Sequence, residues 1–205
     1  SNRELLNWCD VLVIGPGLGT SESSREREQW FLSAAAKEKK PVILDADALN
    51  LLAAHPKWKE FVGENVILTP HIGEMSRLCE KSIAEIQGAI AETASDYAEK
   101  TGAVCVLKDA CTVISDGKGT LYLNLSGNSG MATAGSGDVL AGLLGAVCCM
   151  YLAEEEQPPM VQKAALGVYL HGLCGDIAAG KKGKRGMLAG DIIKNLPAAL
   201  SEGEA

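Results

Sequence analysis

Three short apolar runs, separated by segments with helix signals, dominate the first third of this chain. They lie at 11–15, 41–45 and 66–68 and read V-L-V-I-G, P-V-I-L-D and V-I-L. Between the first two, the capping box Ser23-Ser24-Arg25-Glu26 opens a helix that we expect to continue to about residue 39. Strands that are apolar throughout and alternate with helices are typical of a parallel sheet covered on both faces. The pattern therefore predicts an α/β fold.

The remainder of the chain adds a hairpin and then helices only. The run Asp116-Gly117-Lys118-Gly119 stands between two alternating apolar segments, which is a β-hairpin signal. No internal repeat or linker is visible, so we expect one domain over 1–205. The further elements expected are helices at 49–53, 82–102, 139–152, 160–179 and 190–200 and strands at 103–107, 112–115 and 120–123.

Composition and missing motifs exclude several classes of protein. The net charge is −7 and no basic run is longer than 181–185, which argues against a nucleic-acid partner. No apolar stretch reaches the roughly 18 residues of a membrane span, so we expect no membrane partner. The seven cysteines include no C-x-x-C pair and are interpreted as buried thiols of a reducing, cytoplasmic compartment. P-loop, H-x-x-x-H and G-x-S-x-G motifs are absent, which excludes P-loop NTPases and argues against zinc and serine-hydrolase sites.

The clearest chemical signal is the turn Gly135-Ser136-Gly137-Asp138 directly before an apolar helix. Glycines let the backbone N–H groups at a helix start converge on an anion such as phosphate. A carboxylate beside those donors can take a proton from a hydroxyl during phosphoryl transfer. The alternative is that the glycines only shape a turn and Asp138 caps the helix.

A glycine-rich turn, Gly15-Pro16-Gly17-Leu18-Gly19, follows the first expected strand. With Asp45 after the next strand it is similar to a dinucleotide-binding fingerprint, so a Rossmann domain is one alternative. The glycines, however, follow a G-x-G-x-G spacing and the helix cap comes only at Ser23, too late for that motif. Asp45 and Asp47 could alternatively be a helix cap and a solvent residue, and this interpretation is favoured for Asp47.

Two more polar clusters follow expected strands. In Thr69-Pro70-His71-Ile72-Gly73-Glu74, a helical turn would bring His71 and Glu74 to one side, where Glu74 could hold a hydrated Mg²⁺ or simply satisfy the helix dipole. In the run 108–112, Lys108 could meet a nucleotide phosphate or be solvated. His171 is interpreted as a hydrogen-bonded core histidine and Asp176 as a helix-end residue.

In chain order, these motifs resemble those of one family, the NAD(P)H-hydrate dehydratases of the ribokinase-like superfamily. The matching runs are V-I-G-P-G-L-G, V-I-L-D-A-D-A-L-N-L, L-T-P-H-I-G-E, L-K-D-A-C-T, N-S-G-M-A-T-A-G-S-G-D-V-L-A-G and Y-L-H-G-L-C-G-D. The resemblance spans nearly the whole chain. Because several long motifs in order are more specific than a single glycine turn, it argues against the Rossmann alternative. It implies a three-layer α/β/α fold with a mostly parallel central sheet and a β-hairpin.

The resemblance also implies an activity and a set of site residues. The activity is repair of NAD(P)H hydrate, in which ADP or ATP phosphorylates the ring hydroxyl of the S-epimer and phosphate then leaves. Asp138 would be the catalytic base, and Glu74 would lie near Mg²⁺. The hydrated cofactor would contact Gly17, Gly19, His71 and Asp138, and the adenine nucleotide would contact Lys108, Asp109, Ala110, Cys111, Thr112, Gly135, Ser136 and Gly137.

Some positions depart from the family pattern. The family commonly has glycine at the position of Asp109, proline at Ser129 and glycine at Ala134, so the nucleotide loops are expected to differ in shape. Only fourteen residues precede Gly15, whereas the family has a strand-and-helix region there, so we expect an N-terminally shortened domain. A sheet edge left open in this way favours a homo-oligomer. A functional link to an NAD(P)H-hydrate epimerase is also expected.

Two other functions remain open from the sequence. A small-molecule kinase of the same superfamily would release a stable phosphorylated product. A non-catalytic nucleotide-binding module would bind nucleotide without turnover, although such a module has no need of a base at Asp138.

Overall fold

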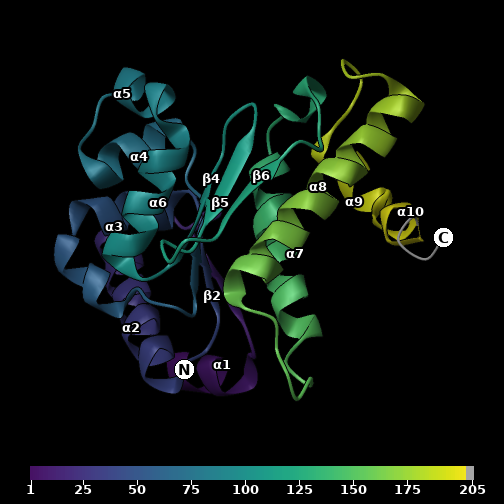
Figure 1. Ribbon diagram of the computed structural model, residues 1–205. Helices are drawn as coiled ribbons and strands as arrows, with labels where there is room; N and C mark the ends of the chain where they lie inside the picture. The colour runs from purple at the N-terminus through teal and green to yellow at the C-terminus, as the bar shows by residue number, and fades with distance from the viewer. Residues whose placement is uncertain (202–205) are drawn as a thin grey trace.

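A six-stranded sheet forms the centre of the protein, which a computed structural model describes over residues 1–201. The strands lie side by side in chain order (Figure 1). The first four are parallel to one another, and the fifth pairs antiparallel with both the fourth and the sixth. This arrangement confirms the expected mostly parallel sheet with a β-hairpin. The strands are β1 (Leu12–Ile14), β2 (Val42–Leu44), β3 (Val66–Leu68), β4 (Val104–Leu107), β5 (Thr112–Ser115) and β6 (Leu121–Asn124).

Helices cover both faces of the sheet and complete a three-layer α/β/α arrangement (Figure 1). On one side lie α2 to α6 and on the other α7 to α10. The helices are α1 (Asn2–Trp8), α2 (Glu22–Glu38), α3 (Asp47–Ala54), α4 (Ile72–Cys79), α5 (Ile83–Gly88), α6 (Ile90–Thr101), α7 (Ser136–Met150), α8 (Met160–Lys182), α9 (Ala189–Lys194) and α10 (Leu196–Ser201), with short 3₁₀ helices η1 (Pro56–Phe61) and η2 (Ser129–Met131).

The strands β2, β3 and β4 are apolar throughout because each contributes side chains to two cores. Successive side chains of a strand point to opposite faces. Val42 and Leu44 of β2 therefore pack in the core under α2 to α6, whereas Ile43, between them, packs in the core under α7 and α8. The same division separates Leu68 from Ile67 on β3.

Two expected helices are each divided in the structure. The expected helix at 82–102 breaks at Ala89, whose φ of −149° and ψ of 50° are not helical, so α5 and α6 are separate. The expected helix at 190–200 stops at Asn195 before α10 begins, and Pro197 has no amide hydrogen to donate to Ile193 and continue α9.

Other sequence expectations have mixed outcomes. All seven cysteines are free thiols, but only Cys105, Cys148 and Cys174 are buried as expected. Cys149 is exposed because it lies one residue further round α7 than Cys148, and the remaining three are partly exposed. α1 was not expected from the sequence. Nowhere in residues 1–201 does a helix combine the length and apolar character that a membrane crossing needs.

Candidate active site

An ion pair between the buried Asp45 and the partly exposed Lys108 joins the carboxyl ends of β2 and β4. Asp45, which directly follows β2, is 3% exposed, and its Oδ1 accepts hydrogen bonds from Lys108 Nζ at 2.8 Å and Thr69 Oγ1 at 2.7 Å. Lys108 follows β4 and Thr69 follows β3. Parallel strands in register bring these three residues together, because the residue after each strand lies at the same edge of the sheet.

The glycine turn at the start of α7 lies against this ion pair. A Cβ placed on Gly137 would lie 3.6 Å from Asp45 Oδ2 and 3.7 Å from Lys108 Nζ. Gly135 has φ +84°, a left-handed conformation that favours glycine. The turn therefore brings the N-terminus of a 15-residue helix next to the Lys108 ammonium.

Three amide groups of this turn are available to a ligand. Within residues 1–201, the N–H groups of Gly135, Gly137 and Asp138 donate to no protein acceptor. The N–H of Ser136 instead donates to the Thr133 carbonyl at 3.2 Å, which closes the turn. The Ser136 amide is therefore engaged within the turn, and the assignment of Ser136 to the nucleotide site stays a prediction.

Asp138 itself is exposed in the first turn of α7. Its carboxylate enters no hydrogen bond or ion pair with any residue that the structure describes. The interpretation of Asp138 as a side-chain cap of α7 is contradicted, because Gly135 is the N-cap residue and no side-chain capping bond is present. The carboxylate is free to meet a ligand hydroxyl.

The first glycine turn is tied to the same edge of the sheet. Gly15 has φ +127°, and a Cβ there would lie 1.7 Å from the Asp45 carbonyl oxygen. Gly17 and Gly19, the predicted substrate contacts, have φ of +68° and +73° and lie further out in the turn. Gly19 N–H donates to Asp47 Oδ2 at 2.8 Å, so Asp47 fixes the turn as well as starting α3.

His71 and Glu74 lie on one side of the first turn of α4, as their spacing predicted, and they form a capping box there. The amide groups of Gly73 and Glu74 donate to His71 Nδ1 at 2.9 and 3.3 Å, and His71 N–H donates to Glu74 Oε2 at 2.8 Å. The Lys108 N–H donates to the Pro70 carbonyl at 2.8 Å, which places the His71 turn beside the ion pair. The exposed His71 side chain thus lies close to Lys108 along the same edge.

Glu74 is engaged by the protein itself. Its side chain is buried, with one oxygen in the capping box and the other 3.5 Å from His71 Nε2. Among residues 1–201 no group of three or more His, Cys, Asp or Glu side chains could hold a metal ion. The prediction that Glu74 lies near Mg²⁺ stays a prediction.

The segment after Lys108 forms a turn into the hairpin. Asp109 and Ala110 are exposed, Cys111 Sγ donates to the Asn124 carbonyl at 3.0 Å, and Thr112 begins β5. The assignment of these four residues to a nucleotide site stays a prediction, supported by their position directly after the Lys108 ion pair.

His171 of α8 supports the α7 turn from behind, as a hydrogen-bonded core histidine. Its Nε2–H donates to the Ser136 carbonyl at 3.0 Å. Burial lowers the pKa of His171 to about 4, with a smaller lowering from the Lys108 cation and an opposing effect of the Ser136 hydrogen bond. The imidazole is therefore neutral at physiological pH, and it fixes the turn without adding charge.

Sequence reasoning missed two contributions to this region. Asp45 was considered only as a ribose ligand or helix cap, yet it holds Lys108 in place. Asp176 was expected at a helix end, but it lies within α8 and accepts hydrogen bonds from Gly127 N–H at 2.8 Å and Asn128 Nδ2 at 2.9 Å. The available signal for Asp45 was an acid directly after a fully apolar strand, where it must find a partner.

The chain is similar to known proteins over nearly its full length. A bifunctional NAD(P)H-hydrate repair enzyme of Thermofilum pendens is 42% identical over 96% of this chain, which covers 36% of that protein. Among solved structures, the ADP/ATP-dependent NAD(P)H-hydrate dehydratase of Bacillus subtilis, co-crystallized with ATP/Mg²⁺, has a TM-score of 0.76 at 32% identity and covers 94% of this chain and 64% of that one. A ribokinase-like superfamily protein of Enterococcus faecalis has a TM-score of 0.81 at 30% identity, with 97% and 65% covered.

These likenesses agree with the fold and with the order of the motifs. The chain spans about a third of the length of the bifunctional relative, so the similarity concerns one part of such a protein. Residues 1–198 match the Carb_kinase family, described as NAD(P)H-hydrate dehydratase. The protein has a ribokinase-like α/β fold and belongs to the NAD(P)H-hydrate dehydratase family.

Proposed function

We propose that this chain catalyses the nucleotide-dependent dehydration of (S)-NAD(P)H hydrate to NADH or NADPH. The observation that carries the proposal is the unpaired Asp138 carboxylate at the start of α7, next to three free amide groups and the Lys108 ammonium. Family membership supports the choice of substrate and of ADP or ATP as phosphoryl donor.

Asp138 acts as general base in this proposal. Its carboxylate takes the proton of the ring hydroxyl while the hydroxyl oxygen bonds to the terminal phosphorus and the nucleotide leaves. The bond between the ring carbon and the phosphorylated oxygen then breaks and phosphate leaves, while the neighbouring ring carbon loses a proton to solvent, so that the carbon–carbon double bond of the reduced nicotinamide is restored. The N–H groups of Gly135, Gly137 and Asp138 stabilise the charge that develops on the phosphoryl oxygens, because such fixed dipoles need no reorganisation.

The two substrates take opposite sides of the Asp138 carboxylate. On the nucleotide side are Lys108, held by Asp45, and the turn 109–112 with the α7 glycines. The hydrated cofactor takes the side of Gly17, Gly19 and His71. The buried Asp45 keeps Lys108 in one position, so its charge is preorganised for a phosphate.

Mg²⁺ belongs to the proposal as a companion of the nucleotide. When bound, it neutralises phosphate charge. Mg²⁺ usually keeps several waters and needs only one or two carboxylates beside the phosphates. One buried acid, Glu74, with no cage around it fits that arrangement as a neighbour of the hydrated ion.

The test is a coupled absorbance assay of NADH or NADPH recovery from the hydrate, with Mg²⁺ and either ADP or ATP. Asp138→Asn should lower the rate by at least about a hundredfold because the base is lost. Asp96→Asn, at an exposed acid of α6, is the matched control and should leave the rate unchanged. If the hydrate is not converted with ADP and is not converted with ATP, the result counts against the dehydratase function.

Two other results would redirect the assignment. A stable phosphorylated product without phosphate release would indicate a small-molecule kinase. Nucleotide binding by calorimetry with no turnover would indicate a non-catalytic nucleotide-binding module. The same titrations compare ADP with ATP.

Compartment and partners complete the proposal. We place the activity in the cytoplasm and link it to an NAD(P)H-hydrate epimerase, because the Thermofilum pendens relative is named as bifunctional. A homo-oligomer is supported by the apolar side chains of Leu5, Trp8 and Val13, which are exposed beside the outer edge of β1, Trp8 by 83%. Light scattering of the purified chain measures the oligomeric state.

A further inference from the structure

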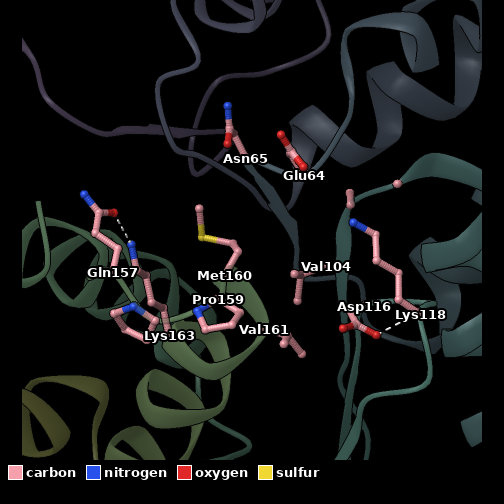
Figure 2. A pocket seen from close by; sticks show the side chains of 13 residues that line it. Glu64, Asn65, Val104, Asp116, Lys118, Gln157, Pro159, Met160, Val161 and Lys163 are labelled. Atoms are coloured by element: carbon pink, nitrogen blue, oxygen red, sulfur yellow. Dashed lines mark hydrogen bonds between the residues drawn. The ribbon is translucent and has the colours of Figure 1, made fainter. Parts of the chain in front are cut away.

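A cavity lies at the end of the sheet opposite the Asp138 turn, where the parallel strands begin (Figure 2). Its volume is about 350 Å³. The walls come from the loop before β3, the start of β4, the end of β5 and the N-terminus of α8. The dehydratase proposal does not use this cavity.

A buried lysine without a counter-charge lines the cavity. Lys163 is 3% exposed, and its Nζ donates to the neutral Gln157 Oε1 at 2.8 Å. The Tyr151 ring centroid lies 5.9 Å from Nζ, and within residues 1–201 no carboxylate lies within 4.0 Å of it. An ammonium has three donors and a buried charge is costly without an opposite charge, so two donors of Lys163 remain for a ligand.

The N-terminus of α8 faces the same cavity. Pro159 is its N-cap residue and provides no side-chain hydrogen bond. The amide groups of Gln162 and Lys163 donate to the Pro159 carbonyl, whereas those of Met160 and Val161, which line the cavity, have no acceptor in the described part of the chain. The free amides of a 23-residue helix and the Lys163 ammonium both favour a negative charge here.

The acids of the cavity do not neutralise Lys163. Asp116 Oδ1 accepts hydrogen bonds from the Lys118 and Thr120 amides at 2.8 and 3.1 Å. Figure 2 places Asp116 and Glu64 on walls away from the Lys163 and Gln157 pair. One side of the cavity is therefore positive and has space beside it.

We propose that this cavity binds a small oxyanion, a phosphate or carboxylate group, on Lys163 Nζ and the Met160 and Val161 amides. The group can be a free anion or part of a small metabolite. Because the site is remote from the α7 turn, the proposal stands independently of the dehydratase function.

The test on the unmodified chain is NMR titration of backbone amides with inorganic phosphate, and separately with acetate. The Met160 and Val161 signals should shift in a saturable way. A response to both anions shows a general oxyanion site, and a response to one identifies the preferred group. If Gly137 and Asp138 shift while Met160 and Val161 do not, phosphate binds only at the α7 turn and the proposal is wrong.

Variants give a second test by calorimetry. Lys163→Met should weaken phosphate binding to this site by at least about tenfold, and Lys163→Arg should retain it. Lys57→Met, at an exposed lysine of η1, is the control and should bind as the wild type does. An unchanged affinity in Lys163→Met would overturn the proposal.

Discussion

Glu28 should make this protein less stable as the pH rises. It lies on α2 with 1% of its surface exposed, and neither carboxylate oxygen has a hydrogen-bond partner among residues 1–201. Burial, with a smaller effect of the Asp47 charge, raises the pKa of Glu28 from 4.5 to about 8. The folded protein therefore holds this proton over a range in which the unfolded chain releases it.

The sign and size of the effect follow from proton linkage. Between pH 4.5 and about 8 the unfolded state is ionised and the folded state is not, so stability falls by about 1.4 kcal/mol per pH unit. The penalty reaches about 3 kcal/mol at pH 7 and about 5 kcal/mol above pH 8. Glu28→Leu removes the titrating group, so its advantage over wild type should increase across this range and then level off.

Urea unfolding at a series of pH values from about 5 to 9 measures this difference. Glu28→Gln keeps the shape of the side chain but cannot ionise, so its stability relative to wild type should depend on pH in the same way as that of Glu28→Leu. Glu26→Gln, at an exposed acid two residues earlier on α2, is the matched control, and its difference from wild type should be flat. A flat difference for Glu28→Leu would refute the reasoning, because Glu28 would then ionise as easily in the folded protein as in the unfolded chain.

Four further substitutions test the site. Gly15→Ala should cost more than about 2 kcal/mol in urea unfolding, because its Cβ would meet the Asp45 carbonyl, whereas Gly17→Ala, with open space around it, should cost about 1 kcal/mol. Asp45→Asn should destabilise the chain by roughly 3 kcal/mol and weaken nucleotide binding in calorimetry, because Lys108 loses its counter-charge. His171→Phe should lower kcat roughly tenfold with little change in nucleotide Kd. The wild type should lose about 3 kcal/mol of stability as the pH falls from 6.5 to about 4, because His171 is protonated in the unfolded chain but stays neutral in the folded protein. His171→Phe should not show this loss.

The strands of this fold were predictable because each carries its own signal. The β2 and β3 runs are apolar at every position, and a strand buried on both faces has no other way to satisfy its two cores. The division of the helix at Ala89 had one local signal, Gly88, which ends α5. Ile86, Ile90, Ala94 and Tyr97 nevertheless keep helical spacing across the break, so the apolar pattern predicted one continuous helix.

The candidate site was predictable as a set of turns but not as a set of contacts. Each of its motifs follows a strand, and parallel strands put those ends at one edge, so the neighbourhood of His71, Lys108 and Asp138 could be inferred. The Asp45–Lys108 pair joins residues 63 positions apart, and no local pattern indicates that one lysine reaches that acid. Likewise, the hydrogen bond of the Ser136 amide to Thr133 is a property of the turn's closed shape rather than of its residue types.

The position of Asp138 depends on how closely α7 approaches the sheet. Gly145 lies seven residues after Asp138, about two helical turns, so the two share one side of α7. A Cβ on Gly145 would lie 2.9 Å from Val13 Cγ2 of β1, so this glycine allows the helix to lie close on the strand. Gly137, in the first turn of the same helix, lies beside the Asp45–Lys108 pair. We therefore expect a side chain at position 145 to move α7 away from β1 and to shift the proposed base relative to that pair.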